Sequence, residues 1–146
     1  LALYKDTEKL LQKMMETRNR VVIQTGEGML VLWTALKSTL KPGDRVLVLS
    51  TGLFGEGFGD MAKALGCEIR VLDFGYDETI HDFDVVEKAI VEFKPKMITM
   101  VQNETPSGTT NPVKEIGDLK VKYGWTSFPV WAGPQFTWTI GMWILR

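Results

Sequence analysis

Apolar and polar positions follow two periods along most of this chain. Short apolar runs rich in β-branched residues, such as Val46-Leu47-Val48-Leu49, are typical of strands buried on both faces of a parallel sheet. Between these runs, apolar side chains recur every three or four positions, which is the spacing of an amphipathic helix. The pattern predicts a first helix ending near Thr17, strands over 21–23, 45–49, 68–72 and 97–101, and helices over 28–39, 55–65, 82–92 and 112–122.

The order of these elements predicts the fold class. Strands that alternate with helices indicate an α/β fold of three layers, a mainly parallel sheet with helices on both faces. Turn residues agree with the boundaries, because Lys41-Pro42-Gly43-Asp44 and Gly66 follow predicted helices and Asp82 stands at the expected N-cap of another.

Composition narrows the class of protein. The chain has 146 residues, of which 45% are hydrophobic and 24% charged, and this is ordinary for one globular domain. Its formal charge is −1 and its 17 Lys and Arg are scattered, so we expect no nucleic-acid partner. Cys67 is the single cysteine, which leaves neither a disulfide framework nor a metal-ligand set. No apolar run is long enough to span a bilayer, and we expect a cytoplasmic protein without a membrane partner.

Three polar, glycine-containing loops follow predicted strands and are the candidates for chemistry. Open α/β sheets bind ligands at the carboxyl ends of their strands, where such loops lie. The loops are Gln24-Thr25-Gly26-Glu27-Gly28-Met29, Ser50-Thr51-Gly52-Leu53-Phe54-Gly55, and Val101-Gln-Asn-Glu-Thr-Pro-Ser-Gly-Thr-Thr-Asn-Pro112.

The first loop has the arrangement of an anion site. A strand followed by Gly26-Glu27-Gly28 and a helix presents free backbone N–H groups to a phosphate. The alternative is that the glycines serve only a tight turn. A nucleotide is not favoured, because Val31 stands where a dinucleotide fingerprint has its third glycine.

The other two loops each offer one side chain. Phe54, between glycines, could stack on a planar ligand, or it could anchor the loop in the core. The Thr105 hydroxyl could donate a hydrogen bond to a ligand, or it could cap its own turn. His81 lies far from these loops along the chain and is interpreted as a solvated loop residue rather than a base.

Together the three loops resemble the cofactor shell of class V, fold-type I aminotransferases, which include the alanine/serine–glyoxylate enzymes. The resemblance covers residues 1–124 and implies part of a fold-type I large domain with pyridoxal 5'-phosphate as cofactor. It implies that the main-chain amides of Glu27, Gly28 and Met29 hold the phosphate, that Phe54 stacks on the pyridine ring, and that Thr105 binds the ring oxygen. It also implies a homodimer.

The composition changes after Gly124. Residues 125–146 hold four of the five tryptophans and none of the 18 acids. Because Trp has a single codon, a reading frame that starts at the last base of each codon turns both Trp125-Thr126 and Trp138-Thr139 into Asp. The string obtained in this way resembles the family's next segment. We therefore expect residues 1–124 to be a partial large domain and 125–146 to be an aberrant, frameshifted tail rather than a domain.

The same resemblance bears on activity. In the family, the Asp that pairs with the pyridine nitrogen and the Schiff-base Lys both follow the segment that matches, so no residue of this chain is predicted to be catalytic. We expect a fragment of an enzyme that moves an amino group between alanine or serine and glyoxylate or pyruvate, and we expect the fragment itself to be inactive. The alternatives are ureidoglycine–glyoxylate transamination, cysteine desulfuration, or a non-catalytic fragment that acts only as a binding or interface module.

Overall fold

The central sheet of the computed structural model has three parallel strands. The structure describes residues 2–14, 18–26, 28–123, 128–132 and 141–145. The strands are β1 (Arg45–Ser50), β2 (Glu68–Asp73) and β3 (Met97–Met100), in the order β2-β1-β3. Val48 of β1 pairs with Val71 of β2 and with Thr99 of β3, so β1 is the middle strand.

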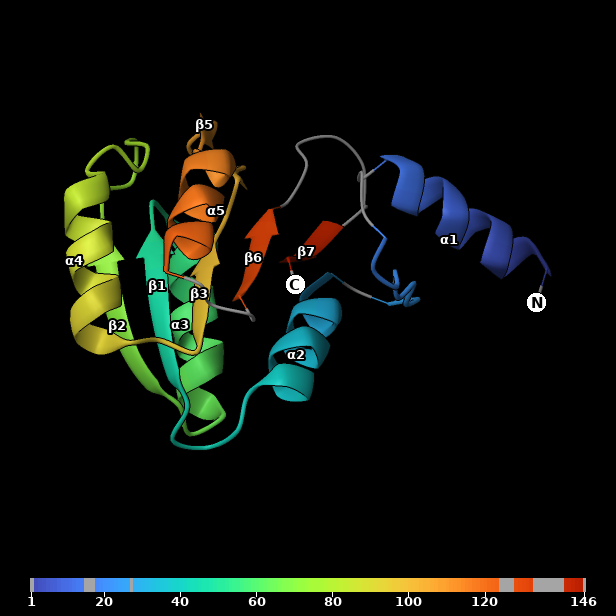
Figure 1. The fold of residues 1–146 in the computed structure, drawn as a ribbon, viewed down its shortest axis with the longest axis horizontal. Helices are drawn as coiled ribbons and strands as arrows, with labels where there is room; N and C mark the ends of the chain where they lie inside the picture. Colours follow the sequence, from blue (N-terminus) through green and yellow to red (C-terminus); the bar gives the residue numbers. More distant parts are fainter. Residues whose placement is uncertain (1, 15–17, 27, 124–127, 133–140, 146) are drawn as a thin grey trace.

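Helices cover both faces of this sheet (Figure 1). On one face, apolar residues of α2 and α3 pack against Val46 and Val48; on the other, residues of α4 and α5 pack against Leu47 and Leu49. Alternate residues of β1 therefore enter opposite cores, and the expected three-layer α/β fold is confirmed. The helices are α1 (Ala2–Met14), α2 (Gly28–Thr39), α3 (Leu53–Ala64), α4 (Phe83–Phe93) and α5 (Val113–Lys122).

Two strand predictions need correction. Residues 21–23 form no strand, although they are β-branched; the N–H of Val21 donates to Glu8 Oε1 (3.2 Å) and that of Ile23 to the Tyr4 hydroxyl (3.1 Å). Side chains of α1 therefore take the donors that a neighbouring strand would use. Strand β2 was expected to be buried on both faces, but it lies beyond β1 and is only half-buried, with Val71 44% exposed.

The third loop contains more structure than the sequence predicts. Two short strands, β4 (Asn103–Glu104) and β5 (Thr109–Thr110), form an antiparallel hairpin directly after β3. The prediction of a polar loop at a strand's carboxyl end still describes its place in the fold.

The described part of the C-terminal segment is a separate antiparallel pair. It consists of β6 (Phe128–Ala132) and β7 (Gly141–Leu145), and β6 lies beside β3 in Figure 1. Residues 124–127, 133–140 and 146 lie outside the described part, so the identification of 125–146 as an aberrant tail stays a prediction.

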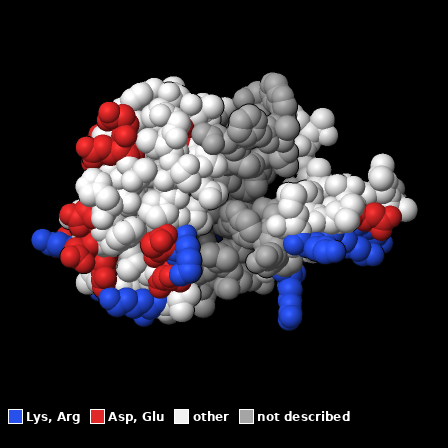
Figure 2. All heavy atoms as spheres, turned by 90° about the horizontal axis from the view of Figure 1, so that it is seen from above, with Lys and Arg blue, Asp and Glu red and all other residues white. Residues whose placement is uncertain are grey.

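Helix α1 projects from the body of the molecule (Figure 1). Its apolar side chains are exposed, with Leu3 81%, Leu10 69% and Met14 68% accessible. Helix α1 carries three lysines and two acidic residues, and both signs of charge are seen on the helix and on the body in the view of Figure 2. Among the described residues, no helix has the length and apolarity needed to cross a membrane.

Asp44 lies directly before β1, at the end of the sheet opposite the loops of Phe54 and Thr105. Its Oδ2 accepts a hydrogen bond from the Lys41 N–H (2.7 Å) and forms an ion pair with Lys96 Nζ (2.5 Å). The hydrogen bond from Lys96, with that from Lys41, holds the pKa of Asp44 below its ordinary value against the opposing effect of burial.

The first prediction concerns this carboxylate. Because its pKa is lower in the folded chain than in the unfolded one, Asp44 stabilises the fold at neutral pH, and this contribution is lost as pH falls through the lowered pKa. Asp44→Asn should therefore reduce the free energy of unfolding near pH 7 by less than about 1 kcal/mol, and the difference from wild type should shrink in acid. Urea unfolding at several pH values measures it.

Lys96→Met provides the second arm of this test. The loss of the Lys96 ammonium should raise the pKa of Asp44, which NMR titration measures. Lys88→Met is the control: it removes an exposed partner of Glu92 and should leave the pKa of Asp44 unchanged. An Asp44 pKa that is the same with and without Lys96 would contradict the assignment of the shift to this ion pair.

Candidate functional site

The loop after β1 presents Phe54 at the start of a helix. Helix α3 begins at Leu53, so Phe54 stands in its first turn, next to the carboxyl end of the central strand. The side chain is 40% exposed and does not belong to either buried core. The ring is therefore accessible to a ligand at this edge of the sheet.

The loop after β3 presents Thr105. It is the first residue of the turn that joins β4 to β5, and it is exposed. The turn is closed by its backbone, because the Gly108 N–H donates to the Glu104 carbonyl (2.8 Å) and Gly108 has the left-handed φ of 73° that glycine tolerates best. The Thr105 hydroxyl thus stands on a turn that is already held by backbone contacts.

The first loop lies apart from the other two. Glu27 is outside the described residues, Gly28 begins α2, and the half-buried Met29 packs against the core between α2 and α3. In Figure 1 the start of α2 lies toward α1, away from the β4–β5 hairpin and the carboxyl end of β1. The structure therefore brings the loops of Phe54 and Thr105 together, and it does not bring the start of α2 to them.

Glu104 joins the second and third loops, and the sequence analysis did not single it out. Its side chain is 1% exposed, and Oε1 accepts a hydrogen bond from the Gly55 N–H at 2.7 Å. An acidic residue in a polar loop is usually solvated, so nothing in the pattern indicated its burial. Its place in the motif 101–112, between an apolar strand and a glycine turn, could have indicated that Glu104 lies near the site, although not that it is buried.

Asn111 is a second buried polar residue that the sequence analysis did not identify. It is 2% exposed, and its Nδ2 donates to Thr51 Oγ1 and to the Val101 carbonyl, both at 2.7 Å. Its Oδ1 accepts from the Ile80 N–H at 3.0 Å. One amide therefore ties the loop after β1, the end of β3 and the segment before α4.

His81 is exposed, as expected from the sequence. Its Nδ1 lies 2.9 Å from the Thr79 carbonyl, and its ring meets the edge of Phe74 at a centroid distance of 5.9 Å. These neighbours belong to the connection before α4, so the described contacts of His81 do not involve the loops of Phe54 and Thr105.

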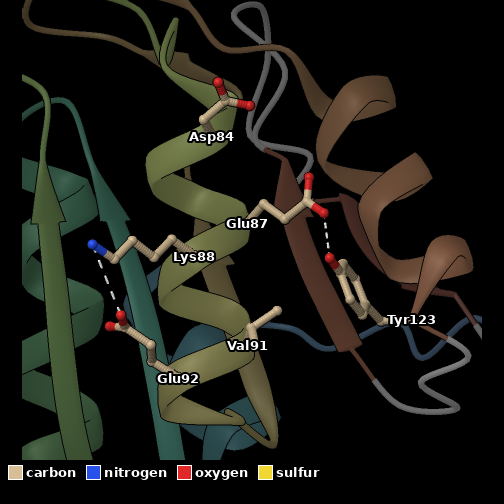
Figure 3. Close-up of a pocket in the computed structure, with 6 residues that line it drawn as sticks. All are labelled: Asp84, Glu87, Lys88, Val91, Glu92 and Tyr123. Atoms are coloured by element: carbon tan, nitrogen blue, oxygen red, sulfur yellow. Dashed lines mark hydrogen bonds and ion pairs between the residues drawn. The ribbon is translucent and has the colours of Figure 1, made fainter.

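A surface depression of about 380 Å³ lies elsewhere, between α4 and the end of α5 (Figure 3). It is lined by Asp84, Glu87, Lys88, Val91, Glu92 and Tyr123. Hydrogen bonds from the Lys122 ammonium and then the Tyr123 hydroxyl lower the pKa of Glu87. The ion pair and the phenol already occupy this carboxylate, so the depression is a solvated helix surface rather than a site of chemistry.

Comparison with known proteins decides the family. The family model described as Aminotransferase class-V matches residues 2–127. This chain belongs to the class-V aminotransferases. One relative, the pyridoxamine–pyruvate transaminase of Mesorhizobium japonicum, is 34% identical over 122 residues, which are 84% of this chain and 31% of that protein.

A second relative is similar in sequence, and a solved structure is similar in fold. The alanine–glyoxylate aminotransferase of Felis catus is 28% identical over 121 residues, 81% of this chain and 28% of that protein. The crystal structure of alanine–glyoxylate aminotransferase from Nostoc sp. superposes with a TM-score of 0.82 at 20% identity, over 99% of this chain and 45% of that one. The chain thus spans about three-tenths of the length of these two sequence relatives.

The second prediction tests the buried amide of this class-V domain. Asn111→Asp keeps the oxygen that faces the Ile80 N–H but replaces both Nδ2 donors with an acceptor beside the Val101 carbonyl. We expect the free energy of unfolding to fall by roughly 2–5 kcal/mol, because a carboxylate is buried and its contact with the Val101 carbonyl becomes repulsive, whereas the Thr51 hydroxyl can turn to donate. Urea unfolding at neutral pH measures this loss.

Asn103→Asp is the matched control, since the Asn103 Oδ1 accepts from the exposed Thr110 hydroxyl at 3.1 Å. It should change the free energy of unfolding by no more than about 0.5 kcal/mol. Equal losses at the two positions would show that the Asn111 contacts are not the source of stability.

Proposed function

We propose that this chain is part of an aminotransferase that uses pyridoxal 5'-phosphate and moves an amino group between a small amino acid, alanine or serine, and a 2-oxo acid, glyoxylate or pyruvate. The observation that carries the proposal is the placement of two exposed side chains, Phe54 and Thr105, on adjacent loops at one edge of the parallel sheet. The names of the relatives, a pyridoxamine–pyruvate transaminase and an alanine–glyoxylate aminotransferase, support the substrate class.

The residues at this edge suit the ring of the cofactor. Phe54 offers an accessible aromatic face for stacking, and the Thr105 hydroxyl is an accessible donor for the ring oxygen. The resemblance assigns the phosphate to the backbone N–H groups of Glu27, Gly28 and Met29, since the first N–H groups of a helix have no partner within it. In this structure the start of α2 lies away from the loops of Phe54 and Thr105 (Figure 1), so it would have to approach them for one cofactor molecule to meet both. When bound, pyridoxal phosphate withdraws electrons from the substrate's α-carbon.

We further infer that these 146 residues do not transaminate by themselves. The family match ends at residue 127, and the Schiff-base lysine that the resemblance implies, after a Ser-Gln pair, is not in the sequence. Without that lysine the chain has no covalent anchor for the cofactor and no base at the α-carbon. The change in composition after Gly124 supports a tail read out of frame, which sequencing of the DNA across codons 120–146 would test.

A homodimer is part of the same proposal. The exposed apolar side chains Leu3, Leu10 and Met14 of α1 support it, because apolar surface of this kind is typically covered in an assembly. The alternatives remain another class V chemistry, ureidoglycine–glyoxylate transamination or cysteine desulfuration, and a non-catalytic interface module.

The third prediction tests the two ring contacts. Phe54→Ala should weaken binding of pyridoxal phosphate to the chain by about 1–3 kcal/mol, because a stacked aromatic ring is lost. Thr105→Val should weaken it by about 1 kcal/mol, the net contribution of one hydrogen bond. Equilibrium titration followed by quenching of protein fluorescence measures both effects.

His81→Ala is the control for this experiment and should leave binding unchanged, since His81 contacts only its own connection among the described residues. Loss of binding on His81→Ala, with Phe54→Ala and Thr105→Val silent, would show that the site is elsewhere. Borohydride reduction followed by peptide mapping tests the inferred inactivity, because a single specifically labelled lysine would contradict it.

A further inference from the structure

Glu104 is buried in a way that its sequence neighbours do not require. It is in β4, its side chain is 1% exposed, and Oε1 accepts a hydrogen bond from the Gly55 N–H at 2.7 Å, across 49 positions of the chain. Its Oε2 is also buried and has no hydrogen-bond partner among the described residues. Burial of a carboxyl group costs free energy, so its burial here indicates a role other than core packing.

The backbone around this side chain leaves room for it. A Cβ at Gly52 would lie 3.3 Å from Glu104 Cδ, and a Cβ at Gly55 would lie 3.4 Å from Oε1 and 3.0 Å from the Ser50 Cα. The 3.0 Å approach is to backbone, which cannot move aside easily, so a side chain at Gly55 would be crowded by Ser50 as well as by Glu104. The two glycines therefore let Glu104 reach the first turn of α3.

The contact satisfies a backbone N–H group at the start of α3. The first N–H groups of a helix have no partner within it, and the helix dipole places positive potential at its start. Glu104 Oε1 satisfies one of these groups in α3 from outside the helix. Its own main chain is also fixed, because the Glu104 carbonyl accepts from the Gly108 N–H across the hairpin turn.

The two proposed ring contacts are each one residue from this hydrogen bond. Phe54 precedes Gly55, whose N–H donates, and Thr105 follows Glu104, whose carboxylate accepts. A single buried contact thus fixes the stacking residue on α3 relative to the hydroxyl on the hairpin. Side chains that must meet the same small ring need such a constraint, since a displacement of about 1 Å weakens binding and catalysis.

We propose that Glu104 is a positioning residue that holds Phe54 and Thr105 in register for one planar ligand, without touching that ligand. The role of the ligand rests on the proposed function, whereas the mechanical link between the two loops does not. The experiment therefore measures the link and the binding separately.

The test compares Glu104→Ala with Glu104→Gln in the 146-residue chain. Amide hydrogen exchange by NMR reports on the loops, and titration with pyridoxal phosphate reports on binding. Glu104→Ala should accelerate exchange at Gly55 and Thr105 and raise the dissociation constant by roughly tenfold or more. Glu104→Gln keeps an oxygen that can accept from the Gly55 N–H, so the exchange rates and the dissociation constant should stay within about threefold of wild type.

Asp82→Ala is the matched control. Asp82 Oδ1 accepts from the Val85 N–H at 3.0 Å and caps α4 as Glu104 Oε1 caps α3, but it lies in the connection before α4. Its removal should accelerate exchange at Val85 and leave Gly55 exchange and cofactor binding unchanged. This separates a local effect on the two loops from a general loss of stability.

Two results would overturn the proposal. If the amide exchange rate at Gly55 is unchanged in Glu104→Ala, the link between the two loops does not exist. If exchange is faster in Glu104→Ala but its affinity for pyridoxal phosphate is unchanged, while Phe54→Ala binds more weakly, the link does not position the ring contacts. If wild type binds no pyridoxal phosphate, the assignment of Phe54 and Thr105 as ring contacts fails, and exchange alone then decides on the link. If Glu104→Ala does not fold, Glu104→Asp against Glu104→Gln replaces it, with faster Gly55 exchange expected only in Glu104→Asp.

Discussion

The side-chain amide of Asn111 is the contact that holds the loops together at the carboxyl ends of the parallel strands. Three segments that are distant in sequence arrive there with backbone or hydroxyl groups that no strand satisfies: the Val101 carbonyl, Thr51 and the Ile80 N–H. A buried asparagine is suited to this place because its amide carries two donors and an acceptor in one rigid plane. Leaving any of these partners unpaired in the interior would cost more than the hydrogen bond itself contributes.

Once this edge is fixed, the positions of the loops follow. Asn111 sets the end of the hairpin segment against the loop after β1, and Glu104, seven residues earlier, sets the hairpin against the start of α3. The apolar cores on both faces of the sheet supply most of the stability, but they do not determine how these loops meet. Two buried polar side chains do, and the exposed Phe54 and Thr105 take their places from them. In this way a parallel sheet becomes a candidate binding edge of a class-V aminotransferase domain.

The periodic parts of the chain could be predicted from the sequence, and the polar parts could not. Apolar runs such as 45–49 and amphipathic stretches such as 82–92 record burial directly, so their elements and the three-layer arrangement were predictable. Residues 21–23 carry the same β-branched signal, yet side chains of α1 satisfy the N–H groups of Val21 and Ile23, and a sequence does not reveal which partner a backbone group finds.

The candidate site was predictable only in outline. Loop positions after the strands followed from topology, and the proposed roles of Phe54 and Thr105 came from the family resemblance, because their side-chain types alone left a structural alternative open. Glu104 and Asn111 were missed because burial of a polar residue depends on partners 49 and 60 positions away. The separation of the start of α2 from the other two loops is likewise a property of the tertiary structure (Figure 1).

The most direct test of this account is to map where pyridoxal phosphate contacts the chain, by following backbone amide resonances during a titration. The account predicts that the largest shifts fall on Phe54, Gly55, Thr105 and Gly108, at the edge held by Asn111 and Glu104. Shifts that fall instead on Glu87, Lys88 and Tyr123, around the depression beside α4, would contradict it.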